Sequence, residues 1–299
     1  SRVIMLGAFS VFLCISLFMS IFAPYPLGLS SVMYGKIKGA ITMSFATLLS
    51  LVLAKFLFND PTILVFLCVS IPVAIGLTEV LNRELNPVKG ILMVGSGIAM
   101  VMVLIISFIT SSANKSLPTL VEEQFKAMEP VFEEYRKQAK ISSADNSFEF
   151  EALFSQPKVL ADMALKSAPA YFLSGIFLML WVNLFLLLKT RRLSKLENEY
   201  KYNELYLLNF KMPDQCIWLV IIFLGLAGLG DNLGEWYPVI GMTGLSTIGV
   251  FYFFQGFGIY LAFLDHMKLR GFLRSILVVL TVLTLSLIHI SEPTRRTPI

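Results

Sequence analysis

The chain has 299 residues, of which 56% are hydrophobic and only 15% are charged, and its mean hydropathy is +0.75. Soluble domains usually carry about 25% charged residues, so this composition excludes a soluble enzyme and indicates a chain solvated by lipid. The formal net charge is only +4, and no run of Lys and Arg is long enough to follow a phosphate backbone, so we expect no nucleic-acid binding.

The first apolar run extends from Val3 to Ala23. It lacks the small-residue cleavage site of a signal peptide, so it predicts a membrane helix. Pro24, Pro26 and Gly28 then interrupt the apolar sequence. The residues from Leu27 to Tyr34 fit either a half-helix enclosed by protein or the body of a short separate span, and the side of the N-terminus stays open.

Seven further apolar runs approach the roughly 20 residues that a helix needs to cross the hydrocarbon. They are Gly39 to Phe58, Thr62 to Val80, Val88 to Thr110, Pro169 to Leu188, Cys216 to Gly230, Pro238 to Leu264, and a last run from Gly271. We therefore predict an all-α, polytopic transmembrane helix bundle of about eight spans. Its N-terminal transmembrane block covers residues 1–110, and its C-terminal block covers residues 169–284.

Residues 111–168 form the one large polar segment. Thr119 and Glu122 have the spacing of a capping box, apolar residues follow at helical intervals, and a second helix is expected to start near Pro157. The segment is thus an amphipathic helical insertion. It serves either as a lid or partner surface, or as a hairpin lying over the bundle.

The loop charges give the orientation, because cytoplasmic loops are enriched in Lys and Arg. Basic residues around Lys36, Arg83, Lys189 and Lys268 occupy alternate loops from the second span onward. The loops between them, which begin at Asn59 and Asp231, carry no positive charge. The basic loops are therefore expected in the cytoplasm, and the 111–168 segment is expected to be extracytoplasmic.

The last fifteen residues, 285–299, read LSLIHISEPTRRTPI. This stretch resembles the in-frame translation of a transposon-end sequencing adapter. We expect a non-native, adapter-derived tail; the alternative is a genuine polar tail after the last helix.

No catalytic pattern stands out. The sequence holds no Gly-rich phosphate loop, no nucleophile elbow and no His-Glu metal pair, and its three cysteines lack metal or redox spacing. His266 stands next to Asp265 at the end of an apolar run, which is typical of a solvated helix end. We expect no enzyme, no catalytic residue, no metal site and no cofactor.

Polar side chains inside apolar runs are the better guide to function, because burying them in lipid is costly. Gln255 lies deep in the seventh apolar run, after Tyr252 and directly before Gly256. Asn183 lies in the fifth apolar run. Each amide either makes an interhelical hydrogen bond or lines a substrate cavity. Gln255, Asn183, Tyr252 and Gly256 are the candidate cavity residues.

Glycine and tryptophan residues indicate how the helices pack and where the membrane interfaces lie. Glycines gather in the sixth and seventh runs, where small residues let helices approach closely. Trp181, Trp218 and Trp236 fall near the expected interfaces and are interpreted as an aromatic belt.

Four short motifs occur in order along the chain: Pro24-Tyr25-Pro26-Leu27 with Tyr34-Gly35-Lys36, Val182-Asn183-Leu184 with Arg191-Arg192, Phe210-Lys211-Met212-Pro213, and Phe253-Phe254-Gln255-Gly256. Together they resemble the YybS-like family of bacterial multi-pass membrane proteins of unknown function. That family is similar in pattern to the substrate-binding components of energy-coupling-factor vitamin transporters. The long 111–168 segment departs from those compact vitamin binders.

The resemblance implies a location in the bacterial cytoplasmic (inner) membrane. It also implies a small-molecule, vitamin-like substrate-binding or uptake component that pairs with a cytoplasmic ATPase module. The alternative is a non-catalytic membrane scaffold in cell-envelope assembly, with the 111–168 segment facing an envelope partner. In both cases the lipid bilayer is the first partner.

Overall fold

A computed structural model describes residues 2–16, 19–58, 62–127, 157–193, 201–230, 234–269, 271–274, 276–277 and 280–281. The described residues form helices and no strand. The elements are α1 (Arg2–Ile15), the 3-10 turn η1 (Ser20–Phe22), α2 (Pro24–Tyr34), α3 (Lys36–Leu53) with its π-helical end η2 (Ala54–Phe58), α4 (Thr62–Asn82), α5 (Pro87–Ala113), α8 (Pro157–Leu193), α9 (Glu204–Leu208), α10 (Cys216–Leu229) and α11 (Trp236–His266). The prediction of an all-α membrane protein is confirmed for this part of the chain.

Five helices are long and apolar enough to cross a membrane. They are α3 with its π-helical end, α4, α5, α8 and α11. The helices α1 and α10 are apolar but have only 14 residues each. The run expected from Gly271 is described only in short stretches, and residues 285–299 lie outside the described residues. Five of the expected eight or so spans thus meet the length and composition of a crossing helix.

The first apolar run is broken in the structure. Helix α1 ends at Ile15, and Pro24 does not end a helix but starts the next one, α2. Proline suits the first turn of a helix because its missing N–H would have had no intrahelical acceptor. Pro24 and Pro26 are both buried, so they remove two such donors from the bundle interior. At 11 residues, or about 16 Å, α2 is a buried half-helix, which is one of the two expected forms.

The backbone at this break is satisfied by two side chains. Ser10 donates from Oγ to the carbonyl oxygen of Ala23 at 2.8 Å, and Asn183 on α8 donates from Nδ2 to the carbonyl oxygen of Ile21 at 2.7 Å. Non-helical backbone is tolerated at membrane depth only where protein supplies such partners. The break is therefore a closed and internally bonded feature.

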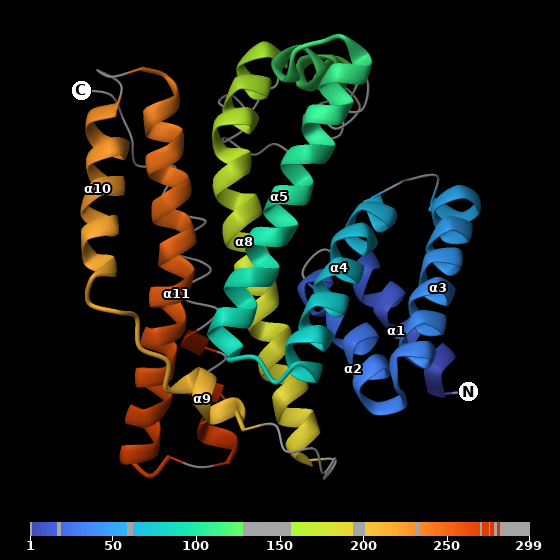
Figure 1. Cartoon of the computed structure of the whole chain (residues 1–299), viewed down its shortest axis with the longest axis vertical. Helices are drawn as coiled ribbons and strands as arrows, with labels where there is room; N and C mark the ends of the chain where they lie inside the picture. Colours follow the sequence, from blue (N-terminus) through green and yellow to red (C-terminus); the bar gives the residue numbers. More distant parts are fainter. Residues whose placement is uncertain are drawn as a thin grey trace, which may run out of the picture.

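Two cores share helix α4 (Figure 1). One core joins α1, α2, α3 and α4 around Val11, Leu27 and Leu67. The other joins α4, α5, α8, α9 and α11 around Leu77, Leu180 and Phe251. Helix α8 runs through the middle of the molecule and contacts α2, α4, α5, α9 and α11, so it fixes both halves to one another.

The expected domain boundaries fall inside helices. The limit at residue 110 lies within α5, and the limit at residue 168 lies within α8, which continues without a break from Pro157 to Leu193. At 37 residues, or about 55 Å, α8 exceeds the hydrocarbon thickness of about 30 Å. The described start of the insertion, residues 117–127, is helical as expected, and residues 128–156 lie outside the described residues.

The capping box predicted at Thr119 is wrong by three residues. Helical residues begin at 117, and Ser116 Oγ accepts the backbone N–H of Thr119 at 3.4 Å, so Ser116 is the capping residue. Glu122 pairs instead with Lys126 at 2.7 Å.

The basic loops all lie at one end of the molecule. Figure 1 shows the α2–α3 turn, the α4–α5 turn and the C-terminal ends of α8 and α11 at the lower end of the view. At this end Lys36 pairs with Glu79 at 3.2 Å and thereby joins α3 to α4, and Arg83 pairs with the same carboxylate at 2.6 Å, four residues further along the chain. These loops thus share one end, as an alternating orientation requires, and their cytoplasmic position stays a prediction; we call this end the lysine-rich end.

One of the three tryptophans contradicts the aromatic-belt prediction. Trp181 is only 2% exposed and stacks on Phe254, with ring centroids 4.6 Å apart. Phe210 and Phe251 meet the same indole edge-on. Trp181 thus lies within the second core, because it packs against Phe251 and Phe254 of α11 and against Phe210. Trp218 and Trp236 are exposed, at 66% and 65%.

Candidate functional site

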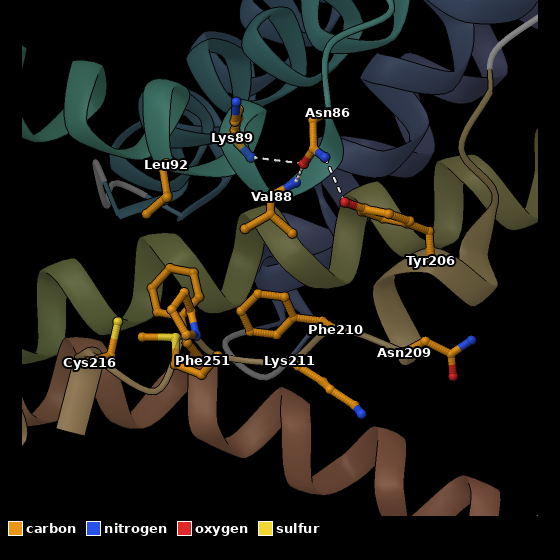
Figure 2. Close-up of a pocket in the computed structure, with 12 residues that line it drawn as sticks. Asn86, Val88, Lys89, Leu92, Tyr206, Asn209, Phe210, Lys211, Cys216 and Phe251 are labelled. Carbon is orange, nitrogen blue, oxygen red and sulfur yellow. Dashed lines mark hydrogen bonds between the residues drawn. The ribbon is translucent and has the colours of Figure 1, made fainter.

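A cavity of about 560 Å³ opens between the first turns of α5, the short helix α9, the following residues 209–215 and α11. Its lining residues are Asn86, Val88, Lys89, Leu92, Tyr206, Asn209, Phe210, Lys211, Met212, Pro213, Cys216 and Phe251. Figure 2 shows Asn86 and Tyr206 meeting at one end, and the rings of Phe210 and Phe251 below Val88 and Leu92.

The polar end is built by Asn86, which has two tasks. Its Oδ1 accepts the backbone N–H groups of Val88 and Lys89 at 3.0 and 3.3 Å, so it caps α5 directly before Pro87. Its Nδ2 faces the Tyr206 hydroxyl at 2.6 Å and thereby ties α9 to α5. One side chain thus sets both the start of a membrane helix and the position of the facing short helix.

The floor is the non-helical stretch 209–215, which leads from α9 into α10. Gln255 on α11 fixes it: its Oε1 accepts the backbone N–H of Met212 at 2.8 Å. Leu208, at the end of α9, lies so close to α11 that a side chain on Gly258 would overlap the Leu208 carbonyl. The floor is therefore held against α11 at two points.

The walls are mainly apolar. Phe251 is buried, Leu92 is 47% exposed, and Cys216 is half-buried at the first turn of α10. Lys89 and Lys211 are exposed and extend from opposite sides of the cavity, away from its rings (Figure 2). The arrangement suits a molecule with an apolar body and a charged or polar end.

Gln255 and Asn183 are not brought together. Gln255 supports the floor of the cavity without being among the described residues that line it. Asn183 is fully buried at the α1–α2 break, where its Nδ2 also donates to the carbonyl oxygen of Met179 at 2.7 Å. Among the described residues, both amides therefore bond irregular backbone and not another membrane helix, and their role in a substrate cavity stays a prediction.

The other two candidates, Tyr252 and Gly256, do not line the cavity. Tyr252 is half-buried and follows the lining residue Phe251. Gly256 is exposed, and no described atom would lie within 4 Å of a side chain placed on it. The cavity is also at the lysine-rich end of the molecule.

A second, smaller cavity of about 230 Å³ lies toward the opposite end, between α8 and the start of α11. It is lined by Lys166, Glu235, Pro238, Val239 and Met242. Lys166 and Glu235 give it both signs of charge, and it has no aromatic wall.

Several lining residues were not predicted. Asn86 stands directly before Pro87 at the start of an apolar run, which is the sequence pattern of a capped helix, and that signal was available. Phe210, Lys211 and Met212 belong to a motif that supported the family resemblance, but nothing in the sequence placed it opposite α5. Among the described residues, no group of three His, Cys, Asp or Glu side chains is arranged to hold a metal ion.

Comparison with curated proteins and with solved structures finds no match for this chain. A family model described as "Predicted membrane protein (DUF2232)" matches residues 2–291, which is nearly the whole chain. The chain therefore belongs to this DUF2232 family of membrane proteins.

Proposed function

We propose that this protein is a membrane component that binds a small amphipathic molecule in the cavity between α5, α9, residues 209–215 and α11. The carrying observation is the cavity itself. A volume of about 560 Å³ lies in the range of small-molecule sites, and its apolar walls end in a few fixed polar groups.

The polar end supplies orientation. The Asn86 amide and the Tyr206 hydroxyl are already bonded to each other, so their directions are set before a ligand enters. Asn209 also lines the cavity and is exposed. A hydroxyl, amide or acid group on the ligand would meet pre-oriented partners there, while Phe210 and Phe251 would cover its apolar part.

Uptake of the bound molecule, as in the energy-coupling-factor components, extends this proposal. Broken membrane helices often carry the substrate in transporters, and the α1–α2 region is broken in that sense. Here, however, Ser10 and Asn183 already bond the carbonyl groups at the break. The cavity near α5 is the stronger candidate for the ligand, with the α1–α2 region as a fixed support.

Cys216 offers a native probe, because it lines the cavity while Cys14 is buried and Cys68 is exposed on α4. The alkylation rate of each cysteine by N-ethylmaleimide would be followed by mass spectrometry on purified protein in neutral detergent. The added compounds would be vitamin-like acids, alkyl phosphates and uncharged alkyl glycosides. A ligand of the cavity should slow modification of Cys216 and leave Cys68 unchanged.

A cavity-filling variant makes the test specific. Leu92→Trp should slow Cys216 alkylation without any ligand and abolish further protection, because the indole would occupy the site. Protection of Cys68 to the same extent as Cys216, or no protection by any compound, would contradict the proposal.

A further inference from the structure

We infer that the ligand of this cavity is an anionic lipid of the cytoplasmic leaflet, whose phosphate lies at Lys89 and Lys211 and whose chain lies between α5 and α10. The inference rests on the proposed function, since it names the class of molecule that the cavity takes.

The depth of the cavity supports a lipid source. It lies along the first turns of α5. These turns directly follow the α4–α5 turn, which carries Arg83 and lies at the lysine-rich end of the molecule. A headgroup lies at this level of a bilayer, and the acyl chain extends from there toward the centre. The cavity wall follows the same direction, from Asn86 at the end of the turn to Leu92 in the second turn of α5.

Lipid-facing surface continues from the cavity. Helix α10 has no buried residue, and it packs against α11. On α5, the exposed apolar residues continue beyond Leu92 with Met93, Met100 and Leu104. A chain leaving the cavity toward the bilayer centre would therefore stay in contact with apolar side chains.

Charge decides between a neutral and an anionic headgroup. Within the described residues, neither Lys89 nor Lys211 has a hydrogen-bond or ion-pair partner for its ammonium group. The acids nearest to them in sequence, Glu84 for Lys89 and Asp214 for Lys211, are exposed and do not line the cavity. Two unpaired cations on opposite rims of one opening attract a group with a negative charge.

The start of α5 does not supply an alternative anion site. Pro87 has no N–H, and the N–H groups of Val88 and Lys89 are already bonded to Asn86 Oδ1. A phosphate at the opening is therefore attracted by the exposed side chains of Lys89 and Lys211, one on each rim. A free phosphate would leave the rings of Phe210 and Phe251 facing water, and this is why the geometry favours a lipid phosphate over a soluble one.

The test uses the full chain in nanodiscs of phosphatidylcholine, with or without added phosphatidylglycerol. The alkylation rate of Cys216 is the readout, and Cys68 on α4 is the internal reference. Phosphatidylglycerol should slow Cys216 selectively. Lys89→Gln and Lys211→Gln should each weaken this protection roughly five-fold, and the double variant about thirty-fold.

The matched control is Lys38→Gln with Lys189→Gln, which removes the same charge from the same end but away from the cavity. It should retain protection. Thermal unfolding of each variant checks that it is folded. If a substitution changes the alkylation rate of Cys216 before any phosphatidylglycerol is added, native mass spectrometry counts the phosphatidylglycerol molecules that the variant retains.

Three outcomes would overturn the inference. Protection by inorganic phosphate in phosphatidylcholine discs would assign the site to a free anion. Absence of any phosphatidylglycerol effect, with protection by a neutral or vitamin-like compound, would overturn the lipid while leaving the proposed function in place. Absence of protection by every compound would overturn both.

Discussion

The two amides inside the apolar runs perform the same task at different places. Asn183 donates to a carbonyl group at the α1–α2 break, and Gln255 accepts an N–H group from the stretch before α10. Each satisfies backbone that has left the helical pattern, which is required where water is absent. In this chain, an amide within a membrane helix marks an irregular segment packed against that helix.

Replacing Gln255 with leucine should loosen the floor of the cavity. The Met212 N–H would lose its acceptor, at a cost of about 1–3 kcal/mol. We expect a lower midpoint of thermal unfolding and faster alkylation of Cys216, measured in the same detergent. Gln255→Glu keeps an acceptor oxygen and should stay closer to the parent protein. Equal behaviour of the leucine variant and the parent would refute this role.

Replacing Asn183 with leucine tests the α1–α2 break. Leucine fills a similar volume but cannot donate to Ile21, so a buried carbonyl group would stay unpaired, at about 1–3 kcal/mol. The thermal midpoint should fall. The matched control is Ser174→Ala on the same helix, because Ser174 Oγ bonds only to its own helix, at Ala170 and Tyr171. A control that destabilises as much as Asn183→Leu would remove the basis for this assignment.

The sequence predicted these positions but not their partners. Burial cost marked Asn183 and Gln255 as residues that need a hydrogen bond. The choice between another side chain, a ligand and an irregular backbone depends on tertiary packing, which hydropathy does not contain. Trp181 was misplaced for the same reason: its position near a span end suggested an interface, whereas the face of α8 on which it stands is buried.

At the scale of elements, apolar runs located helices well and helix ends poorly. A fall in hydropathy marks where a chain leaves the bilayer, but an α-helix continues wherever its backbone bonds can continue. The helix start expected near Pro157 is confirmed, but this helix and the apolar run from Pro169, which were expected as separate elements, form the single helix α8. Conversely, the apolar run from Val3 does not form one helix, since the chain turns between Ile15 and Pro24.

The contact between α10 and α11 depends on a glycine. A side chain on Gly241 would lie 2.7 Å from the carbonyl oxygen of Phe223 and would also overlap the Ala227 backbone. Gly241→Ala should therefore push the helices apart and lower the free energy of unfolding by about 1–3 kcal/mol. Gly249 on the same helix meets no described atom, so Gly249→Ala should be neutral or slightly stabilising.

Unfolding of both glycine variants can be followed by circular dichroism in detergent under identical conditions. The expected order of stability places Gly249→Ala above Gly241→Ala. Indistinguishable variants would mean that α10 does not approach α11 as closely as the structure has it.

At the scale of the whole molecule, α4 and α8 connect two cores, and the cavity lies between the first turns of α5, residues 206–216 and α11. The orientation stays a prediction from loop charge, and the structure adds that the basic loops share one end of the molecule. The cavity itself could not be predicted, because it joins residues of three stretches that are distant in sequence: 86–92, 206–216 and Phe251.

The most direct test of this account is an electron cryo-microscopy structure of the full chain in nanodiscs that contain phosphatidylglycerol. We predict non-protein density between Leu92, Phe210 and Phe251, with its headgroup end at Lys89 and Lys211. A structure in which side chains fill this space and α10 packs directly against α5 would contradict the account.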